Sequence, residues 1–223
     1  MTKKKILTLA LAALIAVTAI TSASVAYFTD TGTARNVFTM GNVNITLDEA
    51  PVDEFGQATD GDRVTENEYG TEAAYPGAVL DKDPTVHNTG SNSAYVRATV
   101  NVSNWMNLVA AYYPEFEATF PNDDYKAALN LLVGELGDGW SVVGVEAGDT
   151  FTVGRFDAKF VLKYDSVVAP GEDTSPMFTQ VKIPVGIDNA NAASFNEIKI
   201  VAQAVQENGF ETWEDAFDAF DGN

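Results

Sequence analysis

Hydrophobic and polar residues alternate along several short stretches of the chain. The clearest stretch is AYVRATVNV at residues 94–102, where an apolar residue occupies every second position. In NVNITLD at residues 42–48, Val43, Ile45 and Leu47 share one face, while the residues between them are polar. Alternation of this kind is typical of β-strands that bury one face and expose the other. The same period of two recurs at residues 140–146, 158–164, 177–185 and 197–206.

Short turn sequences separate these predicted strands. They are rich in glycine, proline and asparagine, which favour the backbone conformations that tight turns need. The clearest are Pro76-Gly77, Asn88-Thr89-Gly90, Gly137-Asp138-Gly139 and Pro170-Gly171-Glu172. Many short alternating strands joined by such turns predict a mainly β protein, built as an antiparallel sandwich.

Two parts of the chain follow the helical period instead. Residues 104–133 carry two apolar stripes with helical spacing, and they predict a helical insertion of two amphipathic helices between strands. Residues 211–220 carry a third stripe and predict a short C-terminal helix. Thr212, followed three residues later by Asp215, has the spacing of a capping box at the start of that helix.

The N-terminus has the three parts of a secretory signal peptide. Three lysines precede an apolar run from Ile6 to Ile20, and Ser24-Val25-Ala26 has the small residues of a cleavage site. An uncleaved membrane anchor is the alternative, but the run is shorter than the roughly 20 residues that span a bilayer. We therefore expect residues 1–26 to be a signal peptide, with cleavage between Ala26 and Tyr27.

The remaining residues, 27–223, are enough for one β-sandwich domain with a substantial core. Within them, residues 49–75 are acidic and show no period, and they predict a long exposed loop.

The charge of the chain narrows its possible partners. The full sequence has 13 basic and 32 acidic residues, and removal of residues 1–26 changes the net charge from −19 to −22. Such a surface repels nucleic acids and anionic membranes, so we expect no nucleic-acid partner. The chain has no cysteine, which excludes disulfides and thiol chemistry and leaves packing and backbone pairing to stabilise the fold.

Few residue patterns point to catalysis. His87 is the sole histidine, and we interpret it as a surface residue near a strand end rather than a zinc ligand or a triad base. We expect no catalytic residues, no enzyme activity and no obligatory cofactor or metal. Calcium is an open alternative, since residues 60–68 and 215–223 cluster oxygen ligands, although neither has EF-hand spacing and both also fit solvated surface.

The segment AYFTDTGTARNVFTMGNVNITLDE, at residues 26–49, resembles the start of the TasA/camelysin family of secreted biofilm-matrix proteins. The resemblance lies in the aromatic Tyr27-Phe28 pair at the cleavage point, in Phe38 and Gly41, and in the alternating strand that follows. Softer similarities occur at residues 75–97, 169–184 and 202–217.

This resemblance implies a jelly-roll-like β-sandwich exported with the help of a SipW-type signal peptidase. It implies a structural protein of the extracellular matrix or cell surface that forms fibres with itself, with other matrix proteins as further candidate partners. In such fibres one subunit donates its N-terminal strand to the next, and Phe28, Phe38, Val43 and Ile45 would be the anchors.

Two alternatives stay open on the sequence. Residues 36–48 can instead be an ordinary first strand that pairs within its own subunit. The protein can also be a monomeric secreted binding module or a camelysin-like metallopeptidase, although the chain lacks the several histidines that such a peptidase site would use.

Overall fold

A four-stranded antiparallel sheet is the largest element of the structure. The computed structural model describes residues 42–70, 72–112, 129–152, 155–187 and 197–222. The sheet has the order β5 (Trp140–Thr152), β6 (Arg155–Tyr164), β4 (Ala94–Val102) and β8 (Ile198–Gln206). Side chains along β4 alternate between buried and half-buried, which matches the alternation in its sequence. β4 thus lies inside the sheet, with β6 and β8 on either side.

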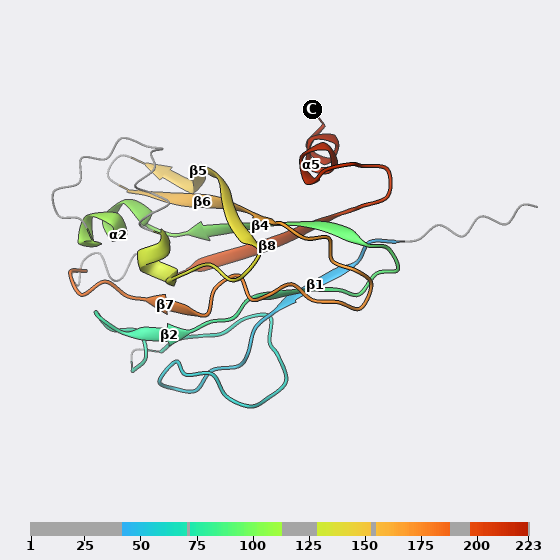
Figure 1. Cartoon of the computed structure of the whole chain (residues 1–223). Helices are drawn as coiled ribbons and strands as arrows, with labels where there is room; N and C mark the ends of the chain where they lie inside the picture. The colour runs from blue at the N-terminus through green and yellow to red at the C-terminus, as the bar shows by residue number, and fades with distance from the viewer. Residues whose placement is uncertain (1–41, 71, 113–128, 153–154, 188–196, 223) are drawn as a thin grey trace, which may run out of the picture. The chain divides into compact units, whose positions relative to one another are not determined.

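A second layer faces this sheet and consists of shorter strands. β1 (Ile45–Asp48) pairs with β3 (Thr85–Asn88), and β2 (Val79–Asp81) pairs with β7 (Gln180–Lys182). The chain around residues 172–174 runs along the other side of β3. There the Asn88 amide donates to the Glu172 carbonyl at 3.0 Å, and the Thr174 amide donates to the Val86 carbonyl at 2.9 Å. β3 is therefore held between β1 and residues 172–174. Figure 1 shows β5, β6, β4 and β8 in one layer and β1, β2 and β7 in the other.

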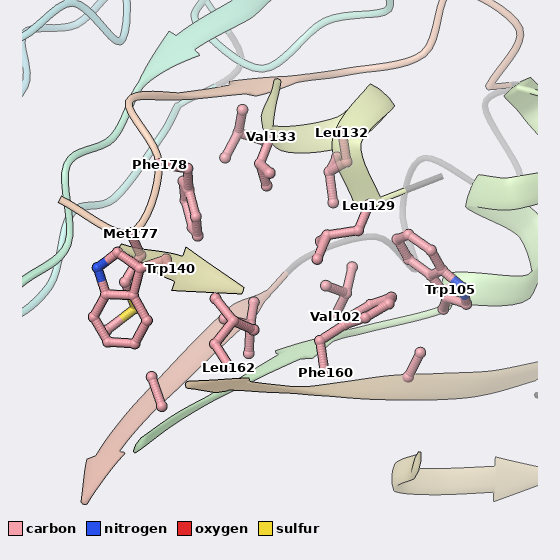
Figure 2. Close-up of a cluster of buried hydrophobic side chains, with 14 of the residues drawn as sticks. Val102, Trp105, Leu129, Leu132, Val133, Trp140, Phe160, Leu162, Met177 and Phe178 are labelled. Carbon is pink, nitrogen blue, oxygen red and sulfur yellow. The ribbon is translucent and has the colours of Figure 1, made fainter. Parts of the chain in front are cut away.

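The main hydrophobic core fills the space between the two layers (Figure 2). Phe160 and Leu162 of β6 are fully buried and face Met177 and Phe178, which precede β7. Trp105 closes one end of this core, with its ring centroid 4.9 Å from that of Phe160 in an edge-to-face arrangement. Burial of this many aromatic and aliphatic side chains is what a disulfide-free sandwich needs for stability.

Helices lie at two places on this framework. α2 (Trp105–Tyr112) buries Trp105, Leu108 and Val109, and residues 129–133 form the end of another helix that buries Leu129 and Leu132. α5 (Trp213–Asp221) packs on the outer face of the four-stranded sheet, where the Trp213 indole N–H donates to the Val96 carbonyl at 2.9 Å.

Residues 49–75 form an extended excursion without a named strand. Most of the excursion is exposed, as the sequence predicts, but Glu49, Gly56 and Ala73 are buried. Ala73 joins a second, smaller core cluster with Ala78, Leu80, Ile183 and Ile187. The excursion therefore packs against β2 and the residues that follow β7.

The predicted mainly β, antiparallel sandwich is confirmed. β4 has the predicted bounds, and helix is present at Trp105–Tyr112 and residues 129–133, within the predicted insertion, and at Trp213–Asp221. The Thr212 side chain accepts a hydrogen bond from the Asp215 amide, so the predicted cap is also present. The middle of the insertion, residues 113–128, lies outside the described residues, as does the predicted signal peptide.

Candidate functional site

A groove of about 880 Å³ opens at the edge of the sandwich where β8 begins. The start of β8 and the end of β1 border it, together with the second half of the 49–75 excursion and residues of β2 and β7. Its apolar lining comes from both core clusters and includes Leu47, Tyr69, Leu80, Val181, Ile183, Ile187, Ile198 and Ile200. The groove is therefore a place where the interior of the sandwich is accessible from outside.

The β8 side of the groove is incompletely covered. β8 pairs with β4 along its full length, and within the described residues no strand pairs with its other edge. Ile198 and Ile200 face the core yet remain half-buried, whereas Val100 and Val102 in the same register positions of β4 are fully buried. An edge strand of this kind presents unpaired backbone groups and apolar side chains to any additional strand.

A buried ion pair lies in the groove wall. The Lys82 ammonium donates to both carboxylate oxygens of Glu49, at 2.8 and 2.6 Å, and the two side chains are only 11% and 8% exposed. Nearby, the Tyr69 hydroxyl donates to the Asp81 carbonyl at 2.7 Å. Burial, with added repulsion from Glu49 and Asp81, raises the pKa of Tyr69, so this phenol stays protonated. These polar side chains of the wall therefore have hydrogen-bond partners within the protein.

The rim of the groove is acidic. Three exposed acidic residues line it, namely Glu66, Glu68 and Glu197. The exposed base Lys199 also lines it. The groove thus combines an apolar floor with a negatively charged rim, a combination that suits an apolar segment without net negative charge.

Two of the four predicted anchors lie beside this groove, in a strand that pairs within the same chain. Ile45 lies opposite Asn88 in the β1–β3 register and packs against the main core. Val43 precedes β1 and is half-buried. Just before it, the Asn42 amide donates to the Ser91 hydroxyl at 3.0 Å. Residues 42–48 thus follow the alternative in which this strand pairs with its own subunit.

The other predicted site residues cannot be placed. Phe28, Phe38 and the Ala26–Tyr27 bond lie outside the described residues. Their roles as anchors and as the cleavage point stay predictions.

A cluster of charged side chains joins β1 to the strands beside it. The imidazole of His87, in the middle of β3, contacts Asp173 Oδ1 through Nδ1 at 2.6 Å and Asp48 Oδ1 through Nε2 at 2.8 Å. Arg63 donates to the same Asp48 oxygen and, at 2.8 Å, to Asp83. The cluster therefore ties β1, β3, residues 172–174 and the 49–75 excursion together.

The charges in the cluster stabilise one another. Partial burial lowers the pKa of His87, but the hydrogen bonds to Asp48 and Asp173 outweigh it and raise the pKa above its ordinary 6.5. Burial raises the pKa of Asp48, but the hydrogen bonds from Arg63 and His87 outweigh it and lower the pKa below its ordinary 3.8. His87 thus bridges Asp48 and Asp173. The sequence-based interpretation of His87 as a surface residue near a strand end did not foresee this role.

One residue in each of the two stretches considered for calcium takes part in an ion pair. Arg63, in the centre of residues 60–68, donates to Asp48 and Asp83 outside that stretch. Asp221, at the end of α5, accepts a bidentate pair of hydrogen bonds from Arg97 at 2.7 and 2.8 Å. Among the residues that the structure describes, no group of three or more acidic or histidine side chains is arranged to hold a metal ion.

The sequence offered no signal for the ion cluster or for the Glu49–Lys82 pair. Their members are separated by 15 to 86 positions along the chain, so they meet only because the strands pair. The sequence contains a partial signal for the groove. It predicted strands at residues 42–48 and 197–206, but it did not predict that these strands lie close together. No described helix is both long and apolar enough to cross a membrane.

Comparison with known proteins gives one match. Residues 1–93 match the family described as camelysin metallo-endopeptidase. No curated protein and no solved structure matches the chain. The matched region includes β1, β2, β3 and the 49–75 excursion, and so most of the groove and the His87 cluster. Residues 1–93 are thus similar to the camelysin family, in agreement with the resemblance to the TasA/camelysin family in the sequence.

Proposed function

We propose that this is an exported structural protein that assembles into extracellular fibres by placing its N-terminal segment in the groove of a neighbouring copy. The observation that carries the proposal is the groove beside the edge of β8 with which no described strand pairs, with half-buried Ile198 and Ile200 on its wall. A strand added at this edge would gain main-chain hydrogen bonds and cover these side chains.

The segment that we assign to the groove is residues 27–41. Phe28, Phe38 and Met40 fall on one face of an extended strand, because their positions differ by even numbers. Asp30 and Arg35 are its only charged residues and cancel, so the segment is neutral within an acidic chain and is not repelled by the acidic rim. Fifteen extended residues reach about 50 Å, which is enough to leave one copy and enter another.

The pairing of residues 42–48 within their own chain refines this proposal. We assign donation to residues 27–41 alone, with β1 as the fixed base from which the segment leaves. A contact between the segment of one copy and the groove of the next joins two different surfaces. Contacts of this head-to-tail type produce an open filament when the rotation between successive copies does not close a ring.

Export and location are part of the same proposal. The signal-peptide pattern at residues 1–26 supports secretion, and cleavage after Ala26 by a SipW-type peptidase would free the donor segment at the new N-terminus. A matrix or cell-surface location is what the resemblance of residues 26–49 to the TasA/camelysin family implies. Other matrix proteins that present a similar segment would be further partners.

A peptide-binding experiment tests the assignment of the segment and the groove. A synthetic peptide of residues 27–41 is added to labelled protein that begins at Asn42, and binding is followed by isothermal titration and by NMR shifts. Saturable binding with shifts centred on Ile198, Ile200 and Leu47 is expected. A peptide with serine in place of Phe28 and Phe38 is the matched control and should bind much more weakly.

Two results would contradict the assignment. One is equal binding of both peptides, because the aromatic anchors would then be irrelevant. The other is binding of the native peptide with shifts confined to surfaces away from the groove.

A metallopeptidase is the second candidate, favoured by the description of the matched family. Both ring nitrogens of His87 are already occupied by Asp48 and Asp173, so metal binding there would require this cluster to rearrange. Cleavage of casein that is lost with a chelator and in His87→Ala would support the enzyme. Cleavage that survives in His87→Ala would exclude His87 as its metal ligand.

A further inference from the structure

We propose that the proton on His87 controls the groove: it fastens β1 to β3 and keeps the β1 wall in place, and its loss as pH rises releases that wall. The inference rests on the proposed function, in which the groove receives a segment of a second copy. It adds a means by which pH decides whether the groove can do so.

The geometry around His87 requires a charged imidazole. A carboxylate can only accept hydrogen bonds, and both ring nitrogens contact carboxylate oxygens, at 2.6 Å for Asp173 and 2.8 Å for Asp48. A neutral imidazole has one N–H and one lone pair, so one of these contacts would become a repulsion between the lone pair and a carboxylate oxygen. The observed arrangement is therefore that of the imidazolium.

The bonds of His87 link β1, β3 and the segment 172–174 of the second layer. Asp48 is the last residue of β1, His87 is in β3, and Asp173 forms a bridge with His87 on the opposite side. β1 has only four residues, and all four pair with β3 alone in the second layer. A strand this short gains much of its attachment from side-chain contacts, so the Asp48–His87 bond matters most at this end.

The other charged groups that face the cluster keep their charge over the relevant range. Arg63, from the 49–75 excursion, bonds Asp48 and Asp83, and its pKa is raised further by these carboxylates despite partial burial. Asp48 has a lowered pKa and stays ionised at neutral and alkaline pH. The chain has no other histidine, so His87 is the member of the cluster whose charge changes near neutral pH.

The same end of β1 is part of the groove. Leu47, Asp48 and the following Glu49 all line it, and Leu47 also packs against the main core. A neutral imidazole keeps one N–H, and when that proton is on Nδ1, toward Asp173, the bond from Nε2 to Asp48 is lost and β1 loosens at this wall. Arg63 still holds Asp48 from the excursion, so the expected change is local opening of β1 and not global unfolding.

NMR of the chain from Tyr27 to Asn223 tests the inference directly. The single imidazole gives unambiguous ring signals, which report the pKa and show whether both nitrogens carry protons. Hydrogen exchange of the β1 amides is measured against β4 amides as an internal reference, from about pH 5.5 to about pH 9. Relative protection of β1 should fall roughly tenfold or more as His87 loses its proton.

Two variants make the test specific. His87→Gln carries no titrating proton and should show low β1 protection that does not change with pH. Asp173→Asn keeps the Asp48 bond but removes the second carboxylate, so the midpoint of the β1 transition should move to lower pH. Relative protection that stays constant through the titration of His87 would overturn the inference, as would a singly protonated ring at neutral pH.

Electron microscopy of the same samples separates this inference from the proposed function. Filaments that form below the His87 midpoint and not above it are expected. Equal filament formation on both sides of that midpoint would overturn control by His87 while leaving strand donation standing. No filaments at any pH, with β1 protection still following His87, would contradict the proposed function and leave the His87 attachment of β1 established.

Discussion

At the scale of single residues, the His87 cluster gathers charged side chains that join β3 to β1 on one side and to residues 172–174 on the other. The His87 imidazole contacts the carboxylates of Asp48 in β1 and of Asp173 in the segment beside β3. Arg63 donates hydrogen bonds to Asp48 and to Asp83. Because the net charge of the chain is −19, additional unpaired acids are unfavourable, and each cation of the cluster offsets local repulsion as well as forming hydrogen bonds.

The pH dependence of stability follows from the two shifted groups. The pKa of His87 is raised in the folded state, so its stabilising contribution is complete below about pH 6.5 and is lost as pH rises through the folded pKa. The pKa of Asp48 is lowered, so its contribution is present above about pH 4 and is lost as pH falls through its folded pKa. The free energy of unfolding in urea should therefore decline from weakly acidic toward alkaline pH.

His87→Gln is the matched control for this decline. It should be less stable than the native chain at weakly acidic pH, and the two proteins should converge as pH rises. A constant difference between them across the whole range would show that the proton on His87 does not contribute to stability.

The Glu49–Lys82 pair gives a second prediction at this scale. Both side chains are nearly buried, so Lys82→Met would leave a buried carboxylate without its partner, at a cost of about 3 kcal/mol in the free energy of unfolding. The double variant Lys82→Met with Glu49→Leu removes both charges and should recover most of that loss. A double variant as unstable as the single one, measured by urea denaturation, would contradict this interpretation.

At the scale of elements, sequence patterns were reliable where an element is long enough to show its period. Nine alternating residues predicted β4 with its observed bounds, and the apolar stripes predicted α2 and α5. β2 and β3 have three or four residues each, too few for a period to be recognised, whereas the alternation at residues 177–185 did predict a strand where β7 lies. Their pairing also depends on partners that are distant in sequence.

The candidate site was less predictable than the fold. The groove depends on which edge of β8 has no described strand beside it and on where the 49–75 excursion folds back against the sandwich. No local sequence pattern encodes either feature. His87 was recognised as lying near a strand end, but its partners Asp48 and Asp173 are set by the register of β1 and by the return of the chain along β3.

The cap of α5 gives a prediction at the element scale. The Thr212 hydroxyl accepts from the Asp215 amide at 3.1 Å, and Phe217 of the same helix is buried on the sheet. Thr212→Ala should lower the free energy of unfolding by about 1 kcal/mol and increase hydrogen exchange in the first turn of α5. Thr212→Ser keeps the acceptor and should behave almost as the native chain. Equal losses in the two variants would show that the hydroxyl is not the stabilising group.

At the scale of the whole molecule, the features point to a protein that joins copies of itself. The sandwich has an accessible groove beside an unpaired strand edge, and the chain has a neutral, aromatic segment just before its first strand. The acidic surface opposes close approach of two copies, so salt that screens charge should favour assembly. Contacts made by main-chain pairing and apolar burial need no cysteine.

Negative-stain electron microscopy of two chains tests the central claim that residues 27–41 join one copy to the next. One chain runs from Tyr27 to Asn223 and the other from Asn42 to Asn223, each first shown to be folded by circular dichroism. Filaments from the longer chain and folded monomers from the shorter one are the predicted result. Filaments from both chains, or folded monomers from both at high concentration across acidic to alkaline pH, would contradict the claim.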